Sequence, residues 1–103
     1  MVNKIVKGKK AKGKINKPKE IAEWMLKQLK MRRDLYQDEV VYEIEQKFGG
    51  KFVYEDENGN PAVDRRILQE FRKMTEKTVV WERGGRFWRF RESGDEAGRR
   101  QAD

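Results

Sequence analysis

The sequence predicts one α+β domain with three amphipathic helices, a β-hairpin inserted between the second and third helices, and a second hairpin after the third. Apolar residues recur at the three- and four-residue spacing of a helix in three stretches of the chain. Two dipeptides typical of hairpin turns, Asn58-Gly59 and Gly84-Gly85, each lie between β-prone stretches. Three helices and two hairpins are enough secondary structure for one small domain.

The first two helices are marked by apolar residues on one side. The first begins near Lys19 and is followed by a short extended link at residues 34–37. The second ends at Gly49-Gly50, since glycine commonly follows the last turn of a helix. The expected core residues of these helices are Ile21, Ala22, Met25, Leu26 and Leu29 in the first, and Val40, Val41, Ile44 and Phe48 in the second.

The inserted hairpin and the third helix follow. Residues 51–63 contain β-prone residues on both sides of Asn58-Gly59 and are expected to form the inserted hairpin. The third helix begins near Asp64 as its N-cap, or earlier with Asn60 as the cap and Pro61 at the first helical position. Its expected core residues are Ile67, Leu68, Phe71 and Met74.

The closing hairpin covers residues 78–91. A two-residue Gly84-Gly85 loop pairs residues whose numbers sum to 169, so that Trp81 faces Trp88. We expect this aromatic pair to lie on the core face of the hairpin. Val79 and Phe90 share that face, and the opposite face, expected to be exposed to solvent, carries Val80, Glu82, Phe87, Arg89 and Arg91.

The order of these elements, with the closing sequence VVWERGGRFWRFR, resembles the winged-helix fold, in which three helices precede a two-stranded wing. The resemblance covers residues 19–92. It implies an α+β domain whose third helix presents a recognition surface to DNA. One departure is that about fourteen residues separate the second and third helices, where the family usually has a short turn. The stretches ENGNPAV and VVWERGG also resemble small bacterial proteins of unknown function.

Several classes of chemistry are disfavoured by composition. The 103 residues include neither Cys nor His, which leaves no disulfide, thiolate zinc site or histidine base. No nucleophile–base pair and no phosphate-binding loop can be identified. We therefore expect a non-enzymatic protein with no metal, no organic cofactor and no small-molecule substrate. The apolar runs are too short to span a membrane and no secretory signal is evident, so a cytoplasmic location is expected.

The excess positive charge lies at the N-terminus. The net charge of +7 equals that of residues 1–20, which hold eight Lys and one acid, whereas residues 21–103 hold 17 basic and 17 acidic side chains. Because residues 1–18 have little apolar surface to bury, we expect this lysine-rich tail to be disordered. The polar residues 93–103 are expected to fray, which leaves residues 19–92 as the domain.

The neutral domain is nevertheless polarised. Residues 34–57 hold eight acidic and two basic side chains, whereas residues 64–92 hold nine basic and five acidic ones. Such a field orients the basic end towards a polyanion. Arginine suits guanine or phosphate, and glutamine suits adenine. The candidate nucleic-acid-binding residues are Arg65, Arg66, Gln69, Arg72 and Lys73 in the third helix, Arg83, Arg86 and Arg89 in the wing, and Lys9, Lys10, Lys12 and Lys14 in the tail.

The function favoured by these patterns is binding of double-stranded DNA by a winged helix, with the tail as a phosphate clamp. Such a protein would be a transcription regulator or accessory factor, acting alone or as a homodimer. RNA or ribosome binding is one alternative. A second is a protein–protein contact made by the acidic second helix and the inserted hairpin. The charges of the third helix also fit an ordinary solvated face.

Overall fold

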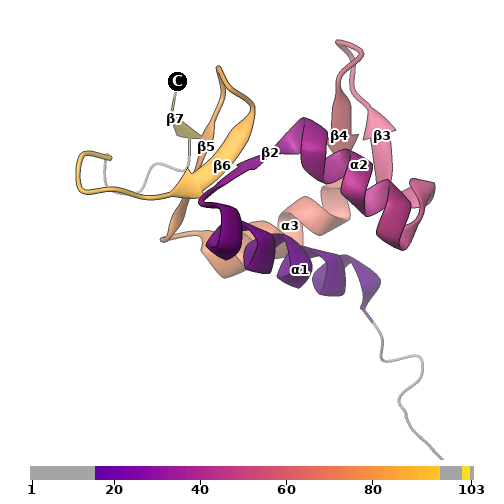
Figure 1. Ribbon diagram of the computed structural model, residues 1–103, viewed down its shortest axis with the longest axis horizontal. Helices are drawn as coiled ribbons and strands as arrows, with labels where there is room; N and C mark the ends of the chain where they lie inside the picture. Colours follow the sequence, from indigo (N-terminus) through magenta and orange to yellow (C-terminus); the bar gives the residue numbers. More distant parts are fainter. Residues whose placement is uncertain (1–15, 96–100, 103) are drawn as a thin grey trace, which may run out of the picture.

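The computed structural model describes residues 16–95 and 101–102, which form three helices and two small sheets (Figure 1). This arrangement confirms the expected α+β class. The helices are α1 (Lys17–Arg32), α2 (Gln37–Phe48) and α3 (Arg65–Thr75), and a single 3-10 turn, η3 (Gly50–Phe52), follows α2. The strands are β2 (Asp34–Tyr36), β3 (Val53–Glu55), β4 (Pro61–Val63), β5 (Val79–Glu82), β6 (Phe87–Phe90) and β7 (Gln101–Ala102).

Helix α1 begins two residues earlier than expected. The side chain of Asn16 accepts a hydrogen bond from the backbone N–H of Lys19 at 3.1 Å and so caps the helix. Pro18 lies in the first turn, where its missing N–H costs no helical hydrogen bond. Lys17 and Pro18 therefore belong to the domain rather than to the tail. Residues 1–15, the rest of the expected disordered tail, lie outside the described residues.

The link between α1 and α2 is a strand. Strand β2 pairs antiparallel with β6, with Leu35 opposite Trp88, and gives the larger sheet the order β2-β6-β5-β7. Leu35 has no exposed surface and Trp88 is only 8% exposed. A single apolar residue in a three-residue stretch thus anchors an edge of the sheet to the core.

The closing hairpin has the expected register. Its pairs run from Val79 opposite Phe90 to Glu82 opposite Phe87, and the rings of Trp81 and Trp88 lie 4.7 Å apart between their centroids. The expected two-residue loop is wrong, because Arg83–Arg86 form a four-residue loop closed by a hydrogen bond of 2.8 Å from the Arg86 N–H to the Glu82 carbonyl.

The left-handed residue of this loop is an arginine rather than a glycine. Arg86 has φ 57°, whereas neither Gly84 nor Gly85 has a positive φ. Gly85 is needed for space instead, since a Cβ atom there would lie 2.5 Å from Cε1 of Phe87. The dipeptide therefore marked the turn correctly but for a different physical reason.

The outer face of the larger sheet is less exposed than expected. Val80 is only 2% exposed, and its cross-strand partner Arg89 is 17% exposed in its side chain. Asp95 binds Arg89, and β7 pairs in parallel with β5, with Gln101 opposite Trp81. These parts of the segment that was expected to fray are thus held against the sheet. Residues 96–100 and 103 lie outside the described part.

The segment between α2 and α3 contains two paired strands and is closed at its base. Strands β3 and β4 pair antiparallel, with Val53 opposite Val63. The N–H of Asp64 donates to the carbonyl of Phe52 at 2.9 Å, which joins the start of α3 to the end of η3. The hairpin therefore projects from a closed base, at which Phe52 and Asp64 are in contact.

Two details of the insertion bear on the sequence predictions. Asp64 caps α3 by accepting from the N–H of Arg66 at 2.8 Å, whereas Pro61 lies in β4, so the alternative start at Asn60 is wrong. In the loop, Asp56 accepts from the N–H groups of Asn58 and Asn60, both at 2.9 Å. Gly59 has φ 79°, the left-handed conformation expected of an Asn-Gly turn.

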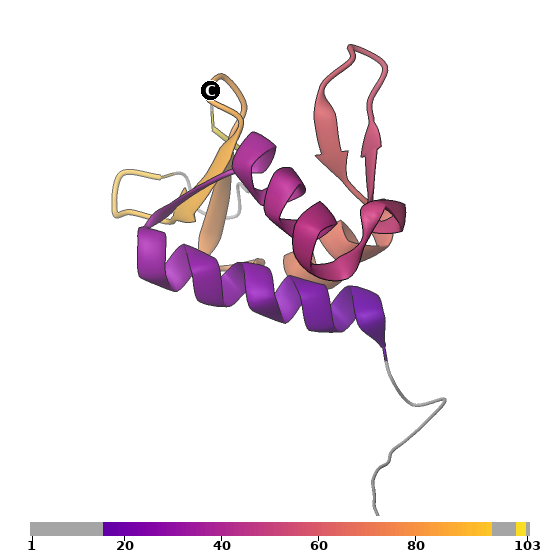
Figure 2. The same ribbon diagram turned by 45° about the vertical axis from the view of Figure 1, so that its right-hand side comes forward.

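The core lies between the three helices and the inner face of the larger sheet. Helices α1 and α3 pack against each other, and the ring of Phe71 meets Trp88 edge-on at 5.6 Å. The two hairpins project on the same side of the molecule in both views (Figure 1 and Figure 2). The buried cluster comprises Ile21, Ala22, Met25, Leu29, Leu35, Val40, Val41, Ile44, Phe52, Val63, Ile67, Phe71, Val79 and Trp88.

Candidate nucleic-acid interface

The outer face of α3 carries a stripe of three polar side chains. Arg65, Gln69 and Arg72 are all exposed, and their spacing of four and three residues places them on one side of the helix over about 10 Å. None of the three has a hydrogen bond or ion pair to another residue in the part of the chain that the structure describes. Their full donor capacity faces solvent.

The flanking basic residues are exposed but paired. The guanidinium of Arg66 donates to both carboxylate oxygens of Asp64, at 2.7 and 3.1 Å. This contact lowers the pKa of Asp64 and raises that of Arg66. The Lys73 ammonium lies 3.4 Å from a carboxylate oxygen of Glu70. Both residues can reach a phosphate only by sharing their charge with a neighbouring carboxylate.

The polarity of α3 favours anions near its first turn. Its first turn contains no acidic residue, and Arg65 and Arg66 occupy the first two helical positions. The positive end of the helix dipole lies here, although Asp64 already accepts hydrogen bonds from the N–H groups of Arg66, Ile67 and Leu68. The exposed Lys77, just beyond the last turn, adds a cation at the other end of the helix, which the sequence patterns did not single out.

Arg86 makes internal contacts from the β5–β6 loop. One guanidinium nitrogen donates to Asp38 at the start of α2 and to the backbone carbonyl of Pro61 at the start of β4, both at 3.0 Å. Its Nε is buried and has no hydrogen-bond partner among the described residues. The side chain thus ties the β5–β6 loop to α2 and to the β3–β4 hairpin, so these internal contacts occupy the arginine that the sequence predicted as a DNA contact.

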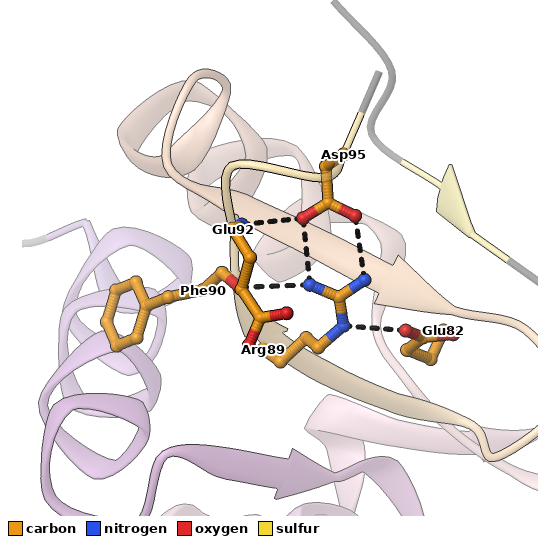
Figure 3. A network of polar contacts seen from close by, with 5 residues as sticks. All are labelled: Glu82, Arg89, Phe90, Glu92 and Asp95. Atoms are coloured by element: carbon orange, nitrogen blue, oxygen red, sulfur yellow. Dashed lines mark hydrogen bonds and ion pairs between the residues drawn. The ribbon is translucent and has the colours of Figure 1, made fainter. Parts of the chain in front are cut away.

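Arg89 is also withdrawn from solvent, contrary to the exposed position expected for it. Its Nε donates to Glu82 at 2.6 Å, and its two terminal nitrogens donate to the two carboxylate oxygens of Asp95, each at 2.9 Å (Figure 3). One of these nitrogens also reaches the carbonyl of Phe90 at 3.1 Å. The bidentate pair holds the pKa of Asp95 well below its usual range and raises that of Arg89.

This network secures the C-terminal segment. Asp95 also accepts from the backbone N–H of Glu92 at 2.6 Å, which fixes the turn after β6 (Figure 3). The sequence predicted neither contact, because Arg89 and Asp95 lie six residues apart across an irregular turn. Arg89 therefore helps to hold residues 92–95 against the β5–β6 hairpin and does not join the stripe on α3.

A buried polar residue that sequence patterns missed connects α2 to both hairpins. Gln37 accepts from the N–H of Val63 through its side-chain oxygen at 3.2 Å, and its own N–H donates to the carbonyl of Arg86 at 3.0 Å. It therefore joins α2, β4 and the wing loop. No local signal in the sequence distinguishes Gln37 from an exposed first-turn residue.

The structure thus brings together only part of the predicted set. Arg65, Arg66, Gln69, Arg72 and Lys73 share the exposed side of α3, and Arg83 is exposed in the wing loop. The side chains of Arg86 and Arg89 instead form ion pairs within the domain. The tail residues Lys9, Lys10, Lys12 and Lys14 lie outside the described part of the chain.

Comparisons with known proteins identify a family but no function. Within the described residues, no group of three or more His, Cys, Asp or Glu side chains is placed to hold a metal ion. No described helix has the length and apolar character needed to cross a bilayer. No curated protein and no solved structure matches the sequence. A family of unknown function, DUF6953, matches residues 17–90, from the start of α1 to the end of β6. The chain therefore belongs to the family of unknown function DUF6953.

Proposed function

We propose that this protein is a winged helix that binds double-stranded DNA through the outer face of α3. The observation that carries the proposal is the stripe of Arg65, Gln69 and Arg72, which is exposed and free of internal partners among the described residues. Most other arginines of the basic half are committed to carboxylates, so the free donors are concentrated on one helix face.

The order of elements supports the winged-helix assignment. Three helices precede the β5–β6 hairpin, and β2 joins that hairpin from between the first two helices. The insertion between α2 and α3 does not oppose it, because the hydrogen bond between Asp64 and Phe52 closes the hairpin at its base. The start of α3 thus stays beside the end of α2, as it would with a short turn.

The chemistry of the stripe fits base and phosphate recognition. An exposed arginine can donate two hydrogen bonds to guanine or to a phosphate, and a glutamine can bond an adenine edge in the major groove. Arg66 and Lys73, on the flanks, then contact phosphates while the lysines of residues 1–15 supply a sequence-independent clamp. Arg86 and Arg89 contribute by fixing the shape of the wing.

The test is a triple substitution of Arg65, Gln69 and Arg72 by Ala. We expect duplex affinity to fall at least about tenfold, because each good base contact is worth about 1–3 kcal/mol. Loss of the two arginines should flatten the salt slope by roughly two units. Thermal stability should change little, since exposed substitutions usually alter it by about 0.5 kcal/mol or less.

A matched control removes the same kinds of side chain elsewhere. Lys27, Lys30 and Gln46 are exposed, and none has an internal partner among the described residues. Their replacement by Ala removes two charges and one amide, and it should leave DNA binding nearly unchanged. Both triple variants are compared in the full chain and in a chain whose six lysines within residues 1–15 are Ala.

The alternatives predict different outcomes. If the tail-neutralised chain still binds duplex DNA and the α3 triple variant binds it equally well, the proposal for α3 is wrong. Tighter binding to an RNA of matched length, lost in the same variant, would redirect the proposal from DNA to RNA. Charge reversal at Glu43, Glu45 and Glu55 instead tests the protein-contact reading, in which the acidic surface is the interface.

A further inference from the structure

The outer face of α2, which we define by Glu39, Tyr42 and Glu45, has no partner element in the described structure. Tyr42 is 64% exposed, far more than is usual for a large aromatic side chain. Glu39 and Glu45 lie three residues before and after it, so all three share one side of the helix. The opposite side of α2 holds the buried residues Val40 and Ile44.

The two glutamates of this face make no direct contact with a cation among the described residues, although Arg32 lies close enough to Glu39 to attract it electrostatically. Other acids of α2 are committed, because Asp38 binds Arg86 at 3.0 Å and Glu43 accepts two hydrogen bonds from Arg32, at 2.6 and 2.9 Å. Glu39 and Glu45 make neither an ion pair nor a hydrogen bond with the described residues. The outer α2 face therefore offers two carboxylates without a hydrogen-bonded cation among the described residues, around an exposed aromatic ring.

The start of α1, to which residues 1–15 are attached, lies next to the C-terminal end of α2. The ammonium group of Lys17, in the first turn of α1, lies 5.9 Å from the ring centroid of Phe48, the last residue of α2. Lys47 lies over the same ring at 5.7 Å. This end of α2 thus already places lysines against an aromatic face.

Residues 1–15 have the charge and the length to cover the outer α2 face. They contain six lysines and no acidic residue. An extended chain of this length spans up to about 50 Å at roughly 3.3 Å per residue. The twelve residues of α2 span only about 18 Å at 1.5 Å per residue. The segment can therefore run along the helix from its C-terminal end to its first turn.

We propose that the lysines of residues 4–14 bind the outer α2 face of the same molecule, with ammonium groups at Glu39 and Glu45 and a lysine on the ring of Tyr42. Each exposed ion pair is weak. Attachment to α1 compensates for this weakness, because a short tether gives an effective concentration in the millimolar range. The contact should be strong at low salt and screened at high salt. It does not depend on the proposed DNA binding, although a polyanion would compete for the same lysines.

The test uses a spin label in the full chain. The sequence has no Cys, so Gly8→Cys creates a unique site for a nitroxide. At 10 mM salt, where the screening length is about 30 Å, the amide NMR signals of Glu39, Tyr42 and Glu45 should lose intensity relative to the reduced label. The amide signals of Gln69 and Arg72 should keep their intensity. At 1 M salt, with a screening length of about 3 Å, the loss should disappear.

A pair of charge variants makes the test specific. Glu39→Gln with Glu45→Gln should restore the α2 signals at low salt. Glu76→Gln with Glu92→Gln removes two equally exposed charges outside α2 and should leave the broadening in place. Broadening that is absent, that spreads equally over α3, or that survives in the Glu39–Glu45 variant would overturn the proposal. Because no nucleic acid is present, these results are independent of the DNA-binding test.

Discussion

Replacing Leu35 by Ala tests whether β2 is an integral part of the domain. Leu35 is completely buried and lies opposite Trp88, itself only 8% exposed. The substitution removes three buried carbons, worth about 0.8 kcal/mol each in transfer from water. The cavity left in a core held by helices and sheet adds to this, so we expect a loss of about 3–4 kcal/mol. That is a large share of the roughly 5–15 kcal/mol that stabilises a typical domain.

Urea unfolding followed by tryptophan fluorescence measures this loss directly, since Trp81 and Trp88 report on the sheet. The control is Met31→Ala, which truncates an apolar side chain that is 70% exposed on α1. It should change the free energy of unfolding by about 0.5 kcal/mol or less. If Leu35→Ala were no more destabilising than Met31→Ala, then β2 would not be anchored to the core and the order of the larger sheet would be wrong.

Two further predictions concern Arg86 and Arg89, the arginines that make internal contacts instead of joining the stripe on α3. Arg86→Gly should be more stable than Arg86→Ala by about 1 kcal/mol. Both variants lose the contacts to Asp38 and Pro61, but only Ala has a Cβ atom that makes the backbone conformation at φ 57° unfavourable. Equal urea midpoints would show that the loop is not left-handed there. The lowered pKa of Asp95 means that its pairing with Arg89 stabilises the fold fully above the ordinary aspartate pKa of about 3.9. This stabilisation is lost progressively as the pH falls from there through the lower folded value. An NMR titration should therefore find the Asp95 carboxylate still ionised where exposed aspartates are half protonated, and titration together with them would contradict the network.

Local patterns predicted much of the fold. The apolar faces of the helices depend on residues three and four apart, so periodicity alone identified buried side chains such as Ile21, Ile44 and Ile67. The register of the closing hairpin follows from strand alternation around a short turn. It holds even though the loop is four residues long, because a loop extended by one residue on each side leaves every pair unchanged.

Features set by distant partners were not predictable in this way. Strand β2 is three residues long and exists through its pairing with β6, which lies more than fifty residues away. The left-handed Arg86 is held by Asp38 and Pro61, neither of which is near it in the sequence.

The same reason limits prediction of the site. The sequence shows nine basic residues between Asp64 and Glu92 but cannot show which carboxylates neutralise them. Arg89 is neutralised by Asp95 across an irregular turn, whereas the side chains of Arg65 and Arg72 have no partner among the described residues. The unpaired stripe therefore emerges only once the ion pairs are known.

The most direct test of the central claim is to map which surface a DNA duplex touches. Uniformly ¹⁵N-labelled full-length protein is titrated with a short duplex at moderate salt, and shifts of backbone amides and of arginine and glutamine side-chain N–H groups are followed. If α3 binds the duplex, the largest changes will occur at Arg65, Gln69 and Arg72. Changes confined to α2 and the β3–β4 hairpin, with the α3 signals unmoved, would contradict it.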